Sequence, residues 1–211
     1  GGGVVEGEPA GVHGPVRLVD ARVDASVECE GAWLGAPGDT ALAADRGHIA
    51  GSLILREGFR ATGQIRLEAT TIGGDLDAGD ATLDDPGPAP KPLRANGAQV
   101  AVSVFLNGRC TVRGPVEMFG IRIGRDLICS RGRFENPGGD ALALNGARIE
   151  GKLMLRGAQA AGRIRLNNGF VGGDVVCGGA RLAGSGDPAQ EALSASRATI
   201  GGHVVLDEGF T

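Results

Sequence analysis

The sequence of 211 residues contains very few aromatic side chains. It has no Tyr, one Trp and six Phe, so aromatic residues make up only 3% of the chain. A wide globular core usually includes large aromatic residues. The composition therefore favours a narrow interior filled by Val, Leu, Ile, Ala and Cys.

Features of membrane proteins and of secreted precursors are also missing from the sequence. No apolar run approaches the ~20 residues that a membrane-spanning helix needs. Residues 1–11 have neither the basic region nor the apolar region of a signal peptide. The formal net charge is only −4, which gives no general electrostatic reason for binding nucleic acid. We therefore expect neither a transmembrane segment nor a nucleic-acid partner.

The four cysteines show no disulfide or zinc-binding pattern. Cys29, Cys129 and Cys177 occupy one position in the first, third and fourth copies of the long repeat described below, with Ala78 in the second. Neighbouring copies lie ~10 Å apart by strand spacing, whereas a disulfide needs Cα atoms within ~7 Å. No CxxC pair is present. We interpret these three residues as small buried apolar side chains, and unpaired thiols favour a reducing cytoplasm. Cys110 falls at a corner of the repeat, where we expect it to be more accessible.

The sequence predicts no catalytic residue, no cofactor and no metal site. The three histidines fall at different positions of the repeat, so they form no ligand cluster. Asp75, Asp126 and Asp174 share one corner position but lie ~10 Å apart, too far for an acid–base pair. We interpret them as carboxylates that cap turns.

Glycine, in contrast, is abundant, with 39 residues, and between 141 and 182 it divides the chain into units of eleven residues. Two apolar residues alternate with polar ones, Gly interrupts the run, and a lone apolar residue precedes the next Gly. The alternation is the strand period of two, whereas so many glycines would each cost a helix ~1 kcal/mol. Two units make a coil of ~22 residues, which must stack on copies of itself.

A longer period of 49 to 51 residues lies above this unit. The matching segments are 41–55, 92–106, 141–155 and 192–206. We therefore predict one domain made of four super-repeats, about 12–60, 61–111, 112–159 and 160–211. Because VLDEGFT at 205–211 matches ILREGFR at 54–60, we expect the array either to continue in a longer protein or to end on an uncapped edge.

Each super-repeat also contains one insertion rich in Pro and in Asp or Asn. The insertions occupy 35–39, 84–92, 135–140 and 183–191. Such residues form turns and disfavour ladder positions in sheets. We therefore expect four loops that project from one edge of the molecule.

Together these patterns predict an all-β, single-domain parallel β-helix of about eight coils, four-sided, with edge loops every second coil. Glycine suits the corners of such a coil, where a positive φ is often needed. One corner position is filled by polar residues whose side chains can bond to the backbone, namely Asp45, Asn96, Asn145 and Ser196.

Two family resemblances follow from particular motifs. IGGDL at 72–76, GARIEGKLML at 146–155 and VGGDVVCGGARL at 171–182 are similar to segments of actinobacterial repeat proteins, some of which are labelled membrane-associated oxidoreductases. The repeat as a whole resembles the pentapeptide-repeat proteins, which form right-handed quadrilateral β-helices. It departs from them because its alternation is five and six residues and the A-D/N-L-x-x signature is not kept. The first resemblance implies an oxidoreductase and the second a DNA mimic that binds topoisomerase.

One outward column forms a weak basic stripe. It consists of Arg17, Ala43, Arg66, Arg94, Glu117, Ala143, Arg165 and Ser194. We interpret it as a solvated face that protects the strand ladder, with anion binding as the alternative.

A second outward column becomes apolar in the latter half of the chain. Its apolar members, which we call the apolar ladder, are Phe105, Ile128, Met154, Val176 and Val205. A stripe of ~20 Å is unusual on a soluble monomer. We predict that it contacts a protein partner or a second copy, unless a loop or a further part of the chain covers it. Trp33, at the base of the first insertion, is either a further contact residue or is covered by its own loop.

The sequence therefore predicts a non-catalytic scaffold or protein-interaction module that uses the apolar ladder and the edge loops. Three alternatives remain. The chain could be a structural protein that polymerises through its terminal coils. It could also be the oxidoreductase or the DNA mimic implied by the resemblances, although the mild net charge of −4 and the basic stripe argue against a DNA mimic.

Overall fold

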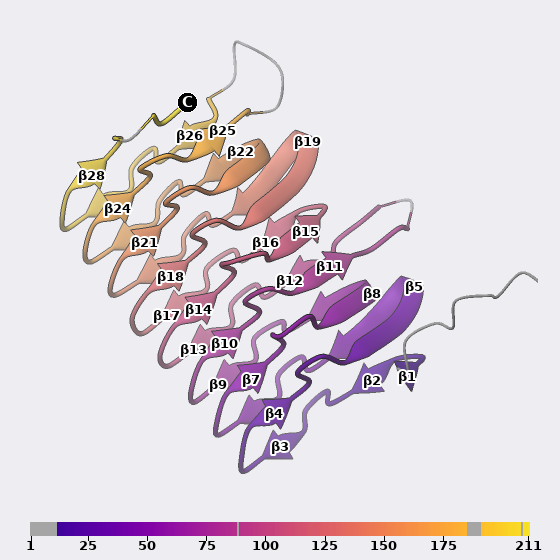
Figure 1. Cartoon of the computed structure of the whole chain (residues 1–211). Helices are drawn as coiled ribbons and strands as arrows, with labels where there is room; N and C mark the ends of the chain where they lie inside the picture. The colour runs from indigo at the N-terminus through magenta and orange to yellow at the C-terminus, as the bar shows by residue number, and fades with distance from the viewer. Residues whose placement is uncertain (1–11, 88, 185–190, 208) are drawn as a thin grey trace, which may run out of the picture.

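The computed structural model describes residues 12–87, 89–184, 191–207 and 209–211, and within them the chain forms a parallel β-helix with no α-helix (Figure 1). Successive coils stack along one axis, and their strands pair in parallel. The all-β solenoid predicted from the sequence is thereby confirmed.

Two sheets, B and C, each take one short strand from every coil. Sheet B contains β3 (Arg22–Val23), β6 (His48–Ile49), β9 (Thr71–Ile72), β13 (Gln99–Val100), β17 (Arg122–Ile123), β20 (Arg148–Ile149), β23 (Phe170–Val171) and β27 (Thr199–Ile200). Sheet C contains β4 (Val27–Glu28), β7 (Leu53–Ile54), β10 (Leu76–Asp77), β14 (Val104–Phe105), β18 (Leu127–Ile128), β21 (Leu153–Met154), β24 (Val175–Val176) and β28 (Val204–Val205).

Sheet A has twelve strands, and each coil contributes two segments to it. The first segments of successive coils pair with one another and form one column, and the second segments form another. Four of its strands span both columns, namely β5 (Trp33–Ala43), β8 (Arg60–Arg66), β19 (Arg133–Ala143) and β22 (Gln159–Arg165). In the other coils the columns are separate strands, namely β1 (Val12–His13), β2 (Val16–Arg17), β11 (Thr82–Asp84), β12 (Leu93–Arg94), β15 (Thr111–Arg113), β16 (Val116–Glu117), β25 (Arg181–Leu182) and β26 (Leu193–Ser194).

Successive coils differ in length. In sheet B, Arg22 pairs with His48, 26 residues later, and His48 pairs with Thr71, 23 residues later. Eight rungs from Arg22 to Thr199 span 177 residues in seven turns, a mean of about 25. This spacing exceeds the expected ~22 because the insertions lengthen every second coil.

The interior is narrow and almost entirely aliphatic. Where the chain leaves sheet C, large and small inward side chains alternate from coil to coil, in the order Cys29, Leu55, Ala78, Leu106, Cys129, Leu155 and Cys177. A large residue stacked on a small one fills the space between coils without overlap. At the last rung the inward residues Val204 and Leu206 are 51% and 52% exposed.

The structure corrects one cysteine assignment. Cys129 and Cys177 are buried as expected, and Cys29 is partly buried. Cys110, which we expected at an accessible corner, is fully buried. Its amide bonds to the Asn107 carbonyl within the turn, so the residue follows the corner and its side chain points into the core.

The insertions lie between the two pairing columns of sheet A. Residues 35–39 and 135–140 lie within the long strands β5 and β19, but residues 36–39 and 136–139 have no partner in β8 or β22 and form excursions from the sheet. Both strands shift register there relative to their neighbours β8 and β22. The segment 84–92 connects β11 to β12, with residue 88 outside the described residues. Most of 183–191 also lies outside them.

Polar side chains at the corner before sheet B extend the hydrogen-bonded stack from coil to coil. Side-chain oxygens of Asp45, Asn96 and Asn145 accept the amides of Glu68, Phe119 and Asn167 in the following coil. The predicted capping role is therefore confirmed for these three residues. Ser196 differs, because its own amide donates to Asn167.

A second capping column lies between sheets B and C. Asp75, Asp126 and Asp174 each accept, at 2.7–2.9 Å, the amide of the equivalent residue one coil later, which is Ser103, Lys152 or His203. The interpretation of these carboxylates as turn caps is confirmed. Each cap satisfies a backbone donor that the short strands leave unpaired.

Gly63 and Gly162 lie beside the points where the excursions of β5 and β19 leave the sheet and return to it, which we call the necks. Their φ angles are +128° and +135°, and an added Cβ would lie 2.3 Å from the Ala36 carbonyl oxygen and 2.5 Å from that of Asn136. We predict that Gly63→Ala and Gly162→Ala each lower the free energy of unfolding by ~2 kcal/mol or more, because strain and overlap add. Chemical denaturation measures the change.

Gly97 provides the matched control for these substitutions. It has a φ of +66° with open space around it, and Arg46 and Ala69 adopt φ 53° at the same corner of other coils. Gly97→Ala should therefore cost less than either neck substitution. Equal losses of unfolding free energy at all three sites would show that positive φ alone, and not the close approach of a carbonyl, requires glycine at positions 63 and 162.

Asp174 makes the stack sensitive to acid. Hydrogen bonds from the Lys152 ammonium at 2.8 Å and from the His203 amide lower its pKa from 3.8 to about 2. Because the folded-state pKa is depressed, this stabilisation is present above the unfolded value and is lost as pH falls from about 4 through about 2. We predict that the difference in melting temperature between wild type and Asp174→Asn shrinks over that window. A difference that stays constant from pH 5 to pH 2 would contradict the assignment.

Candidate functional site

The structure brings the five residues of the apolar ladder into one column on the outer face of sheet C. Phe105 pairs with Ile128, and the register continues through Met154 and Val176 to Val205. In β14, β18, β21 and β24 the preceding residue is buried, whereas the ladder residue is only partly buried. The outward placement is confirmed, and the contact role remains a prediction.

The same column is charged near the N-terminal end. Asp77 pairs with Phe105 on one side and with Ile54 on the other, and Ile54 pairs with Glu28. The Asp77 carboxylate lies 3.6 Å from the guanidinium of Arg56. The apolar ladder therefore begins at Phe105, and on its N-terminal side it is bounded by the ion pair between Asp77 and Arg56.

Trp33 lies apart from the apolar ladder, at the start of β5 in sheet A. Its ring extends back over Gly35, where an added Cβ would lie 2.7 Å from the ring atom Cζ2. The indole Nε1 donates to the Thr62 hydroxyl at 3.4 Å. The side chain is partly buried against its own excursion, so the structure does not group it with the five ladder residues.

The basic stripe of sheet A is largely neutralised by neighbouring carboxylates. Arg66 lies 2.6 Å from Asp45, and Arg94 lies 2.7 Å from Glu68. Arg165 lies 3.3 Å from Asp140. These pairs favour the interpretation of a solvated, ladder-protecting face over anion binding.

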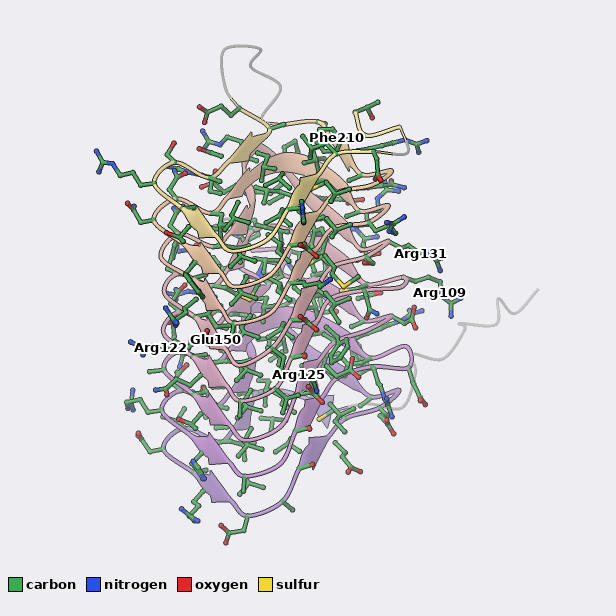
Figure 2. All side chains as sticks on the ribbon, turned by 90° about the vertical axis from the view of Figure 1, so that its left-hand side faces the viewer. Arg109, Arg122, Arg125, Arg131, Glu150 and Phe210 are labelled. Carbon is green, nitrogen blue, oxygen red and sulfur yellow. The ribbon has the colours of Figure 1, made fainter. Side chains whose placement is uncertain are left out.

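Sheet B carries a shallow groove that sequence reasoning missed. A hollow of about 280 Å³ runs across β9, β13, β17 and β20. Its floor is made by small residues, Gly73, Ala101 and Gly124, and its polar lining includes Thr71, Gln99, Arg122, Arg148 and Glu150. Figure 2 shows Arg122 and Glu150 close together on one flank of the rod. The signal in the sequence was the repeated pairing of Arg with an acid two residues later.

Arg148 forms a fixed wall at one end of this groove. Its guanidinium carbon lies 4.2 Å from the centre of the Phe170 ring, a cation–π contact. It also binds Glu150, with a distance of 3.2 Å between Nη2 and Oε2. A second hollow beside Phe170 extends the groove along the rod.

The described residues offer little for redox, metal or nucleophilic chemistry. No group of three or more His, Cys, Asp or Glu side chains in this part of the chain is placed to hold a metal ion. Burial raises the pKa of Cys110 to about 12 and that of Cys177 to about 11, so neither thiol is a nucleophile near neutral pH. None of the described residues forms a helix that is long and apolar enough to cross a membrane.

Comparison with known proteins adds no family. No family model, no curated protein and no solved structure matches the chain. The parallel β-helix is thus shown by the structure, whereas both family resemblances depend on the sequence motifs alone.

The burial of the thiols predicts their reactivity. Cys29 is the only partly buried cysteine of the four, so we expect a thiol reagent at pH 8 to modify one cysteine per native chain and all four in denaturant. Mass spectrometry identifies the modified residue, and Cys29→Ala is the control that removes native labelling. Labelling of native Cys110 as fast as Cys29 would contradict its placement in the core.

Proposed function

We propose that this chain is a non-catalytic protein-interaction module that contacts its partner through the apolar ladder. The observation that carries the proposal is the unbroken register of five partly exposed apolar residues on sheet C. Soluble monomers rarely display contiguous apolar patches without a binding role. A few residues near the centre of a patch, aromatic ones among them, supply most of the binding energy in interfaces.

The architecture supports this role because the ladder is independent of the core. From Phe105 to Val176, each ladder residue points away from the buried residue beside it, so its side chain can change without opening a cavity. The excursions of β5 and β19 lie in sheet A, on another face of the same coils. They provide a second contact element that can select the partner.

A second copy of the chain is the first partner to test, since identical rods present identical ladders. We predict that Phe105→Asp and Met154→Asp weaken self-association at least tenfold, because each buries a charge at the centre of the contact. Sedimentation velocity over a range of concentrations measures the association. Thr82→Asp, at an outward position of sheet A, is the matched control and should leave it unchanged.

Two further measurements separate the alternatives. Circular dichroism and melting should show that both ladder variants remain folded, because the substituted side chains lie outside the core. Leu206→Lys tests association through the exposed last rung. If Leu206→Lys abolishes association while the ladder variants leave it intact, the chain associates through its terminal coil and the apolar ladder is not the contact surface.

A further inference from the structure

Outward arginines in several coils have a carboxylate two residues later on the same strand or its extension. Arg22 lies 2.8 Å from Asp24, and Arg148 is bound by Glu150. Side chains at i and i+2 point to the same face of a strand, so the acid neutralises the arginine beside it. On the outer face of sheet B this local pairing neutralises Arg22 and Arg148.

Arg122 is the third arginine at this outward position of sheet B and has no carboxylate two residues later. It occupies the position equivalent to Arg148 in the neighbouring coil, but the residue two places later is Gly124. In the described part of the chain no carboxylate pairs with its guanidinium. The fold also prevents an internal counter-ion here, because a Cβ on Gly124 would lie 2.0 Å from the Ala101 carbonyl oxygen.

Gly124, which stands where Arg148 has its acid, lies in the groove of sheet B. The floor of the groove at Gly73, Ala101 and Gly124 is open, and Arg122 stands on its rim. The hydroxyl of Thr71 and the amide of Gln99 line the same side as further hydrogen-bonding groups. The exposed guanidinium therefore faces a pocket that is shaped for an external group.

We propose that this groove binds a carboxylate on an extended segment of another polypeptide, with Arg122 as its charged contact. A carboxylate is the group that the fold itself places beside Arg22 and Arg148 in the equivalent positions. Arginine binds a carboxylate through two parallel hydrogen bonds. The groove crosses four rungs, ~14 Å by strand spacing, which matches about four residues of extended chain.

This site is independent of the proposed function of the apolar ladder. The groove lies on sheet B and the ladder lies on sheet C, so substitutions in one leave the other intact. Glu150 lies one coil away from Gly124 at the equivalent position, so its negative charge repels a carboxylate bound over Gly124. Removal of that charge should therefore strengthen the binding of an acidic segment.

The test uses acetyl-tetraglutamate amide as the probe and acetyl-tetraglutamine amide as its uncharged counterpart. Backbone amide shifts are followed by NMR during titration at low salt, where such contacts are least screened. We expect shifts at residues 71–73, 99–101 and 122–124 with the acidic peptide alone. Arg122→Gln should weaken its binding at least tenfold, because a charge-assisted bond is lost.

Arg125→Gln is the matched control for charge. Arg125 is also exposed, but it lies outside the groove lining and apart from Arg122 (Figure 2). It should leave binding within twofold, whereas Glu150→Gln should strengthen it. The carboxylate assignment is overturned if both peptides bind alike, if Arg125→Gln weakens binding as much as Arg122→Gln, or if only inorganic phosphate shifts these amides.

Discussion

Every coil of this molecule depends on hydrogen bonds to the coil beside it. Strands of two residues cannot satisfy their own backbone groups, and they pair only with the same segment one turn away. At the corners, where strand pairing stops, side chains such as Asp45 and Asp126 accept the amides that remain. Because buried or crowded backbone donors must be paired, the stack is continuous through sheets and corners alike, and stability is distributed along the rod.

Because backbone pairing and the corner caps hold the coils together, the outward side chains are free for other uses. A residue that faces outward recurs in register from coil to coil, so one substitution per coil builds a long surface. In sheet A the result is a set of ion pairs, as between Arg94 and Glu68. In sheet C it is the apolar ladder. In sheet B the same charge balancing operates for Arg148 but not for Arg122, and the difference becomes visible only when neighbouring coils are superimposed.

The fold and its register could be predicted because period, glycine corners and polar caps all indicate the same coil. Details that depend on the precise path of the backbone could not. Cys110 follows a turn that returns its side chain to the core, and residues 35–39 form an excursion inside the long strand β5 in place of a separate loop. The groove was missed because its floor depends on contacts between coils. Gly124 has no room for a side chain beside the Ala101 carbonyl of the neighbouring coil, and the sequence of one strand does not reveal this contact.

The two-coil period of the sequence has a physical cause in the core. At the corner after sheet C, large and small inward residues alternate along the axis, as in Leu106, Cys129 and Leu155, so that each large side chain fills the space beside a small one. In two coils the opposite corner compensates, since Leu67 accompanies Ala78 and Ala95 accompanies Leu106. Each of these coils therefore fills a similar volume with one large and one small residue. Cys29, Cys129 and Cys177 belong to this alternation as its small members, which accounts for their recurrence without any redox or metal chemistry.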